Sequence, residues 1–93
     1  MGMHSTQITL GAGATRFSTT SVRIREIYLE NNAGNVMRVA GSTVSATVGI
    51  SLTASGVPAS VLHLGPHTAL NMDLSEFWVF GTANDKLDVL YVT

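Results

Sequence analysis

The sequence predicts an all-β fold, an antiparallel β-sandwich of about eight short strands. Short runs rich in β-branched and aromatic residues recur along the chain, and clusters of Gly, Asn, Ser and Thr separate them. No stretch shows the sustained apolar spacing of an amphipathic helix. Because eight antiparallel strands in two sheets is the strand count of a jelly roll, we expect jelly-roll-like connections.

The first third of the chain should contain three strands. Residues 1–6 are expected to form a flexible N-terminal arm, followed by strands at residues 7–10 and 14–18. The longest candidate is residues 22–30, whose apolar side chains occupy even positions before Arg25 and odd positions after it. One extra residue in a strand produces such a shift, so a β-bulge is predicted near Arg25. A strand buried on both faces is the alternative.

Turn residues divide the middle of the chain. Asn-Asn-Ala-Gly-Asn at residues 31–35 predicts a hairpin turn that leads into a strand at residues 36–39. Further strands are expected at residues 44–52 and 60–64, and a meander through residues 69–73 leads to the C-terminal segment.

Residues 74–93 predict a second hairpin, in which two apolar runs flank a Gly-Thr-Ala-Asn-Asp-Lys turn. Phe77 and Val79 should point to one side of the sheet, and Trp78 and Phe80 to the other. Large aromatic side chains on both sides indicate that one pair meets a neighbouring subunit. The alternative is that loops of the same chain cover both sides.

The composition is that of one small domain, residues 1–93, with few charges. Only 12% of the residues are Asp, Glu, Lys or Arg, against about 25% in an average protein, while 45% are hydrophobic. Neutral polar side chains, another copy or another protein must therefore cover the surface.

The net charge of the chain is −1, so it lacks the basic excess of a nucleic-acid-binding protein, and no apolar run reaches membrane-span length. Neither nucleic acid nor a membrane is an expected partner.

No residue pattern predicts a catalytic site, a cofactor or a bound metal. His63 and His67 lie four residues apart, but Gly65 and Pro66 exclude the helix on which that spacing brings two ligands together. The acidic residues near the C-terminal turn are too few for a calcium loop, and no serine lies in a nucleophile elbow. The chain has no cysteine and is not expected to be an enzyme.

Five residues are predicted to form a protein interface. Arg23 and Arg25 share one face of their strand, and Arg38 is expected across the 31–35 hairpin from them. Trp78 and Phe80 are the aromatic residues expected on the outer side of the C-terminal hairpin. The alternative for the arginines is a solvated face paired with neighbouring glutamates.

Three segments resemble a group of small structural proteins of tailed bacteriophages. They are Ala-Thr-Arg-Phe-Ser-Thr-Thr at residues 14–20, Asn-x-Gly-Asn at 32–35 followed by Val-Ser-Ala-Thr-x-Gly-Ile-x-Leu at 44–52, and the ending at residues 73–92. The resemblance covers most of the chain from about residue 14 and contains no catalytic signature. It implies a β-sandwich protein of the virion.

The resemblance and the low charge content together give the functional expectation. The chain should be a capsid decoration (cement) protein that bridges subunits of the major capsid protein, forms a homotrimer or homodimer, and resides in a virion assembled in the host cytoplasm. One alternative is a protein of the tail, baseplate or fibre. A second is a carbohydrate- or receptor-binding module that stacks sugars on Trp78.

Overall fold

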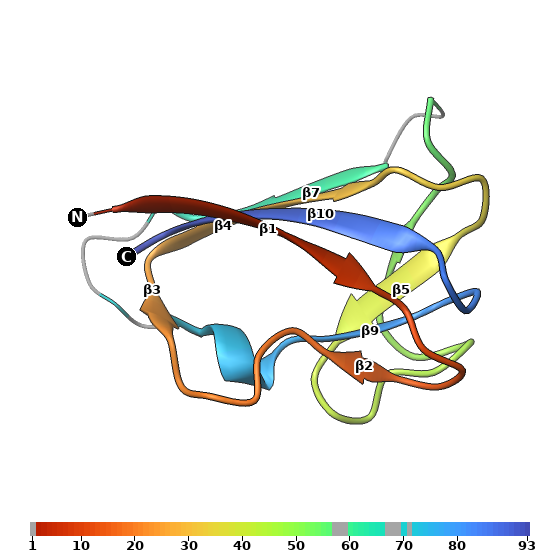
Figure 1. Ribbon diagram of the computed structural model, residues 1–93, viewed down its shortest axis with the longest axis horizontal. Helices are drawn as coiled ribbons and strands as arrows, with labels where there is room; N and C mark the ends of the chain where they lie inside the picture. Colours follow the sequence, from red (N-terminus) through yellow and green to blue (C-terminus); the bar gives the residue numbers. More distant parts are fainter. Residues whose placement is uncertain (1, 57–59, 67–69, 71) are drawn as a thin grey trace.

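The computed structural model describes residues 2–56, 60–66, 70 and 72–93, which form ten strands and one short 3-10 helix (Figure 1). The elements are β1 Met3–Thr9, β2 Thr15–Arg16, β3 Arg23–Ile24, β4 Glu26–Asn31, β5 Met37–Ala40, β6 Ile50–Leu52, β7 Val61–Leu64, β8 Met72–Asp73, η1 Leu74–Glu76, β9 Trp78–Phe80 and β10 Lys86–Val92.

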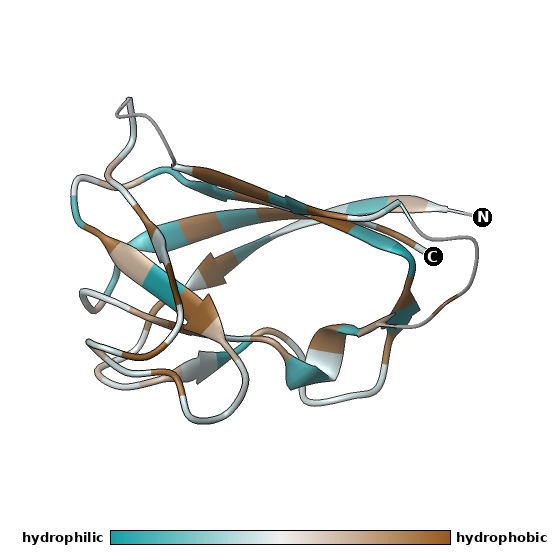
Figure 2. Ribbon diagram, turned by 180° about the vertical axis from the view of Figure 1, so that it is seen from behind, coloured by the Kyte–Doolittle hydropathy of each residue, from teal (hydrophilic) through white to brown (hydrophobic). Residues whose placement is uncertain are grey.

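The strands form an antiparallel β-sandwich, which confirms the predicted fold class. Sheet A has the strand order β1-β10-β4-β7, and sheet B has the order β2-β9-β5-β6. A third pair, β3 with β8, forms a small sheet C. In Figure 1 sheet A crosses the top of the molecule, and sheet B lies below it on the right. Brown and teal bands alternate along several strands in Figure 2, as expected for strands with one buried face.

The pairing of the strands is nested. The first strand pairs with the tenth, the second with the ninth, the third with the eighth, the fourth with the seventh and the fifth with the sixth. Most connections therefore cross from one sheet to the other instead of forming hairpins. Two predicted hairpins are wrong for this reason, because β4 and β5 belong to different sheets, and so do β9 and β10.

The predicted C-terminal turn exists, although it does not form a hairpin. The Asp85 N–H donates to the Thr82 carbonyl at 3.1 Å, and Asn84 adopts a φ of 72°, a conformation that asparagine tolerates. The N–H of Asn84 donates to Leu10, and the N–H of Leu10 donates to Asp85. These bonds join the turn to the end of β1, so β10 continues along β1 and β4 in sheet A.

The predicted flexible N-terminal arm is largely a strand. β1 begins at Met3 and pairs with β10 from Met3 opposite Val92 to Thr9 opposite Lys86. Backbone bonds between Gly2 and Thr93 extend the pairing beyond both strand ends. This strand is difficult to predict from the sequence because β1 is an edge strand with mostly exposed, polar side chains. Such side chains lack the apolar alternation of a half-buried strand.

Arg25 separates β3 from β4 at the predicted interruption. Its N–H donates to the carbonyl of Val92, the residue that also lies opposite Glu26 in the ladder. Two neighbouring residues thus face one partner, which is the arrangement of a β-bulge. Ile24 and Ile27 on either side are both fully buried, so the shift in the apolar pattern is confirmed.

The core lies between the two large sheets. Its buried side chains come from strands of both sheets and from the connections, namely Leu10, Phe17, Ile24, Ile27, Leu29, Met37, Val39, Leu52, Leu74, Val79, Leu87 and Val89. Phe17 and the half-buried Phe77 pack with ring centroids 5.6 Å apart. The outer faces of sheets A and B remain as candidate binding surfaces.

Candidate functional site

The outer face of sheet B carries two arginines and two large aromatic side chains. Side chains alternate along strands, and Val79 is fully buried, so Trp78 and Phe80 point outward as predicted. Register places Arg16 opposite Trp78 and Arg38 opposite Phe80. We call these four residues the arginine–aromatic face.

Backbone carbonyls hold both guanidinium groups in place. Arg16 donates its Nε–H to the Ser75 carbonyl at 2.7 Å, and its Cζ lies 5.6 Å from the centroid of the Trp78 ring. Arg38 donates from Nη1 to the Gly49 carbonyl at 2.8 Å. Each arginine therefore keeps further N–H donors for a partner, in a geometry that is already ordered.

This face lacks negative charge. The strands of sheet B contain no Asp or Glu. Within the part of the chain that the structure describes, neither Arg16 nor Arg38 forms an ion pair. Glu76 of η1 is close in sequence, but it lines a groove between the sheets. The arginine–aromatic face thus presents two positive charges beside two half-buried aromatic side chains.

The outer face of sheet A is hollowed and acidic. Its hollow has a volume of about 650 Å³, and strands β1, β4, β7 and β10 line it. Register and alternation place Glu26, Glu30 and Asp88 on this face. Lys86 lies on the same face at its edge, where it donates to Thr9 at 3.2 Å. We call this surface the acidic face.

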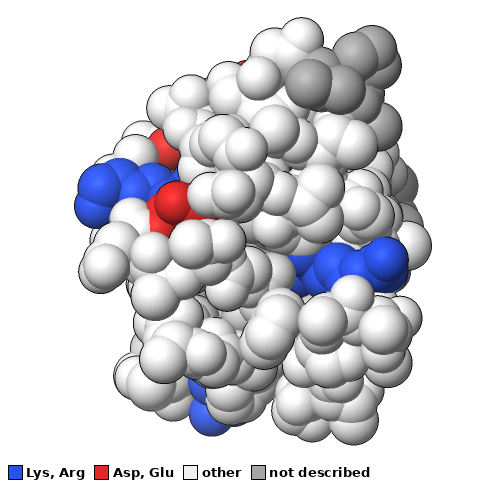
Figure 3. Space-filling model, turned by 90° about the vertical axis from the view of Figure 1, so that its right-hand side faces the viewer, with Lys and Arg blue, Asp and Glu red and all other residues white. Residues whose placement is uncertain are grey.

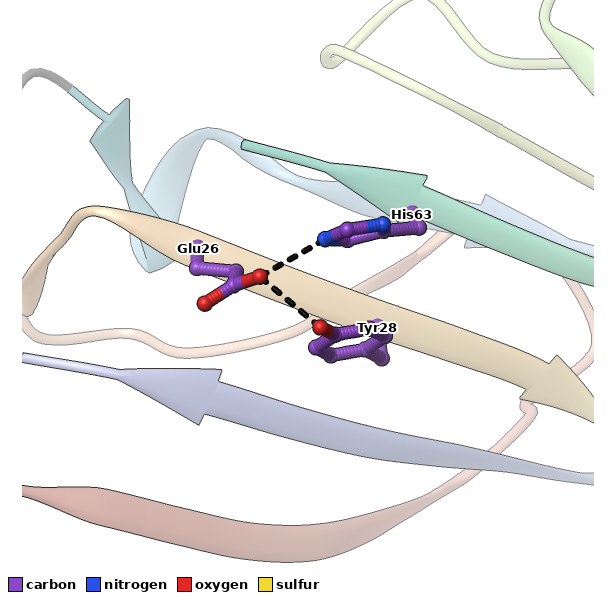
Figure 4. A network of polar contacts seen from close by, with 3 residues as sticks. All are labelled: Glu26, Tyr28 and His63. Atoms are coloured by element: carbon purple, nitrogen blue, oxygen red, sulfur yellow. Dashed lines mark hydrogen bonds and ion pairs between the residues drawn. The ribbon is translucent and has the colours of Figure 1, made fainter. Parts of the chain in front are cut away.

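Glu26, Tyr28 and His63 form a polar cluster on the acidic face (Figure 4). The Tyr28 hydroxyl donates to Oε2 of Glu26 at 2.8 Å, and Nε2 of His63 lies 2.7 Å from the same oxygen. The two rings stack with their centroids 4.0 Å apart and an angle of 8° between their planes. His63 therefore covers one face of the Tyr28 ring.

Hydrogen bonding within this cluster changes two pKa values. The bond from Tyr28, followed by the bond to His63, lowers the pKa of Glu26 because both stabilise the carboxylate. The same bond raises the pKa of Tyr28, because the carboxylate accepts from the protonated phenol. Glu26 therefore keeps its negative charge at neutral pH.

Two carboxylates face each other elsewhere on the acidic face. Glu30 of β4 and Asp88 of β10 are directly opposite in the ladder. Gln7 donates its side-chain amide to Asp88 at 2.9 Å, but among the described residues no cation pairs with Glu30 or Asp88. Like charges in directly opposite positions are destabilising. A positively charged partner would relieve this repulsion.

The structure does not assemble the three predicted interface arginines into one surface. Arg23 lies in sheet C and donates from Nη2 to the Leu70 carbonyl at 2.7 Å. Arg25 is half-buried at the bulge, and its Nε has no hydrogen-bond partner among the described residues. Arg38 belongs to sheet B, so the expectation that it lies across a hairpin from the other two is wrong. The role of all three in an interface stays a prediction.

Apolar side chains are exposed along the edge of the sandwich where β6 and β7 lie. Ile50 of β6 is 58% exposed, and Val61 and Leu64 of β7 are 54% and 37% exposed. A groove of about 540 Å³ opens between the sheets here, lined largely by apolar side chains including Ile50 and Leu64. β6 and β7 are also edge strands, whose outward backbone groups are open to pairing.

Asp73, one of the acidic residues near the C-terminal segment, has a structural role. Asp73 caps η1, accepting from the N–H of Ser75 at 2.9 Å and of Val22 at 3.1 Å, and from the Ser21 hydroxyl. These bonds hold the pKa of Asp73 far below its usual value, with the Ser21 bond as the main cause. His67 lies outside the described residues. Among the described residues no group of three possible ligands surrounds a metal position.

Comparison of the chain with protein-family models, with curated proteins and with solved structures found no match. In the described part of the chain, no helix combines the length and hydrophobicity needed to cross a bilayer. The candidate site therefore rests on the geometry of the two outer faces and of the apolar edge.

Sequence reasoning named Trp78, Phe80 and Arg38 but did not bring Arg16 beside them. It also missed the cluster of Glu26, Tyr28 and His63. The alternation of these residues with apolar neighbours was visible in the sequence. The sequence did not show which strands are adjacent, because the paired strands come from segments far apart in the chain.

Proposed function

We propose that this chain is a structural protein of a tailed-phage virion, a capsid decoration protein that binds other copies of itself and subunits of the major capsid protein. The resemblance of residues 14–20, 32–52 and 73–92 to such proteins supports the proposal. The low charge content supports it too, and on the end of the molecule that Figure 3 presents, the charged side chains form small separate areas among uncharged ones. A surface of this kind suits burial against neighbouring subunits.

The exposed apolar edge carries the proposal. Ile50 and Leu64 are exposed on two edge strands and line an apolar groove, and Val61 is exposed on the same strand as Leu64, where it lines the hollow of sheet A. Large exposed apolar areas are a liability for an isolated small protein. A neighbour that covers this edge would bury these side chains and the open strand edges together. Many weak contacts of this kind, repeated over a symmetric shell, give strong overall binding.

The connections of the strands support the jelly-roll part of the prediction. Apart from the short β3 and β8, eight strands form two four-stranded sheets, with the first strand paired to the last and the pairing nested inward. This pattern is compatible with the double-sheet, Greek-key arrangement of a jelly roll, an architecture found in viral capsid proteins. The fold alone does not specify function, so the proposal depends on the apolar edge and the resemblance.

Copy number tests the proposal most directly. The native particle would be purified, and this chain quantified against the major capsid protein by mass spectrometry. A decoration protein should be present in hundreds of copies, on the order of one per capsid subunit. A dozen copies or fewer would place it in the tail or baseplate, and its absence from particles would refute a virion role.

A matched pair of variants tests the apolar edge. Ile50→Asp should weaken binding to particles that lack the protein by at least about tenfold, because it puts a charge into the buried contact. Met3→Asp is the control, since Met3 is 71% exposed but lies on β1 at the opposite edge of sheet A. Equal binding by both variants would show that the β6–β7 edge does not contact the shell.

The geometry restricts the carbohydrate-binding alternative. Arg16 lies over the Trp78 ring, and His63 stacks on Tyr28. Sugar stacking uses open aromatic faces, so a sugar would have to stack on the other face of either ring.

A further inference from the structure

We propose that copies of this chain associate head to tail, with the arginine–aromatic face of one copy seated on the acidic face of the next. This inference rests on the self-association part of the proposed function and specifies which surfaces meet. The head-to-tail contact is tested on the isolated protein, whereas the virion role is tested on purified particles. The failure of one proposal is therefore distinguishable from the failure of the other.

The charges of the two faces are complementary. The acidic face has three carboxylates, from Glu26, Glu30 and Asp88, and one ammonium group, from Lys86 at its edge. The arginine–aromatic face has two guanidinium groups and no carboxylate. Oppositely charged surfaces steer association and fix the register of the partners.

The acidic face also has an unrelieved repulsion that a second copy would remove. Glu30 and Asp88 lie opposite each other without a cationic partner among the described residues. Guanidinium groups bind carboxylates with two parallel hydrogen bonds, and those of Arg16 and Arg38 are already ordered by carbonyl contacts. An arginine placed between Glu30 and Asp88 would pair with both.

The side-chain types of the two faces also suit an interface. Trp and Arg are the residue types that most often dominate binding energy at protein interfaces, and the arginine–aromatic face presents both. The acidic face offers a hollow of about 650 Å³, with Leu90 and Tyr28 among its lining residues. Trp78 or Phe80 entering this hollow would bury aromatic surface while the charged groups pair around it.

The size of the two faces limits how strongly they can bind each other, and their difference decides the symmetry of the assembly. Sheet A follows the longest dimension of the molecule, 33 Å, whereas the strands of sheet B have only two to four residues, so the arginine–aromatic face is the smaller surface and limits the contact. Specific interfaces bury about 800 Å² per partner, and a contact limited to this smaller face should bury less, so weak association is expected. Because two different surfaces meet on opposite sides of the sandwich, the contact does not close after two copies and produces larger assemblies.

Sedimentation velocity at several concentrations is the first test. The wild-type protein should show a concentration-dependent series beyond a dimer at about 50 mM salt, and about 500 mM salt should weaken association at least tenfold. A monomer at every concentration and salt would overturn the inference. Association that stops at a dimer would overturn it as well, because a dimer requires the same surface on both copies.

Charge reversal with rescue is the decisive test. One variant carries Arg16→Glu and Arg38→Glu, which makes both faces acidic, and the other carries Glu30→Lys and Asp88→Lys, which makes both faces basic. Each variant alone should sediment as a monomer, whereas an equimolar mixture should associate at least as strongly as the wild type. Rescue on mixing shows that both variants are folded, and association of either alone at wild-type strength would overturn the inference.

If the mixture stays monomeric, circular dichroism and thermal unfolding of each variant decide between two explanations. Two folded variants that fail to associate would overturn the inference. If a variant is unfolded, the single substitutions Arg38→Glu and Asp88→Lys replace the double ones, with the same expected rescue and the same refuting result.

Discussion

Asn31 should contribute strongly to stability, because it is a fully buried polar residue with all its bonds inside the protein. Its side chain is 0% exposed. The amide nitrogen donates to the carbonyls of Asn35 at 2.7 Å and Leu52 at 3.1 Å, and the amide oxygen accepts from the N–H of Ala33 at 3.0 Å. One side chain thus holds the end of β4, the following turn and the end of β6 together.

The size of the effect follows from what Asn31→Ala leaves behind. The Leu52 carbonyl loses its partner in a buried position, which costs about 1–3 kcal/mol. The groups of Ala33 and Asn35 are more accessible, so water can replace the lost partner and each loss should cost about 0.5–1 kcal/mol. The sum is about 2–5 kcal/mol, against a total stability of about 5–15 kcal/mol for a domain of this size.

Urea denaturation followed by tryptophan fluorescence would measure this loss. Asn32→Ala is the matched control, since Asn32 is the exposed neighbour and should change the free energy of unfolding by less than about 0.5 kcal/mol. Asn31→Asp should cost at least as much as Asn31→Ala, because it removes the donor and buries a charge. A loss below about 1 kcal/mol for Asn31→Ala would refute this account of the buried amide.

Two further predictions concern a glycine and a carboxylate. Gly49 has a φ of 125°, and a Cβ there would lie 2.9 Å from the Val39 carbonyl oxygen, so Gly49→Ala should lower the free energy of unfolding by about 1–3 kcal/mol. Gly34→Ala has open space for its Cβ and should change it by less than about 0.5 kcal/mol; equal losses in urea would contradict the steric argument. Asp73 has a folded-state pKa below its usual value of 3.8, so its stabilising effect is complete above that pH and disappears as the pH falls. Asp73→Asn should therefore reduce stability at pH 7 and flatten its decline below about pH 4, measured by urea denaturation at several pH values; an unaltered acid decline in Asp73→Asn would contradict this role.

The positions of several strands could be predicted from local sequence. The interruption near Arg25 and the outward direction of Trp78 and Phe80 were also predictable. In a strand with one buried face, apolar and polar residues alternate, so the sequence indicates which side chains point outward. β1 was largely missed, because an exposed edge strand has no such alternation and is held by backbone bonds to β10. The two predicted hairpins were wrong, because the strands on either side of each turn belong to different sheets.

The candidate surfaces could be predicted only in part. Trp78, Phe80 and Arg38 were identified by residue type and by the expected exposure of alternate positions in strands. Arg16 joins them only because β2 pairs with β9, and Tyr28 meets His63 only because β4 pairs with β7. These pairings join residues far apart in the chain, and nothing local to either strand specifies its partner.

The sequence by itself determined the all-β class, the low surface charge, the position of the bulge and which side chains face inward, because burial alternates within each strand. The tertiary structure alone decided which strands pair, because a turn with apolar runs on both sides has the same local pattern whether it joins neighbours in one sheet or crosses between two. The cost of closing long connections is recovered only when both sheets bury their apolar faces together, as they do around Ile27 and Val79. That global closure also set the two charged faces on opposite sides of the sandwich.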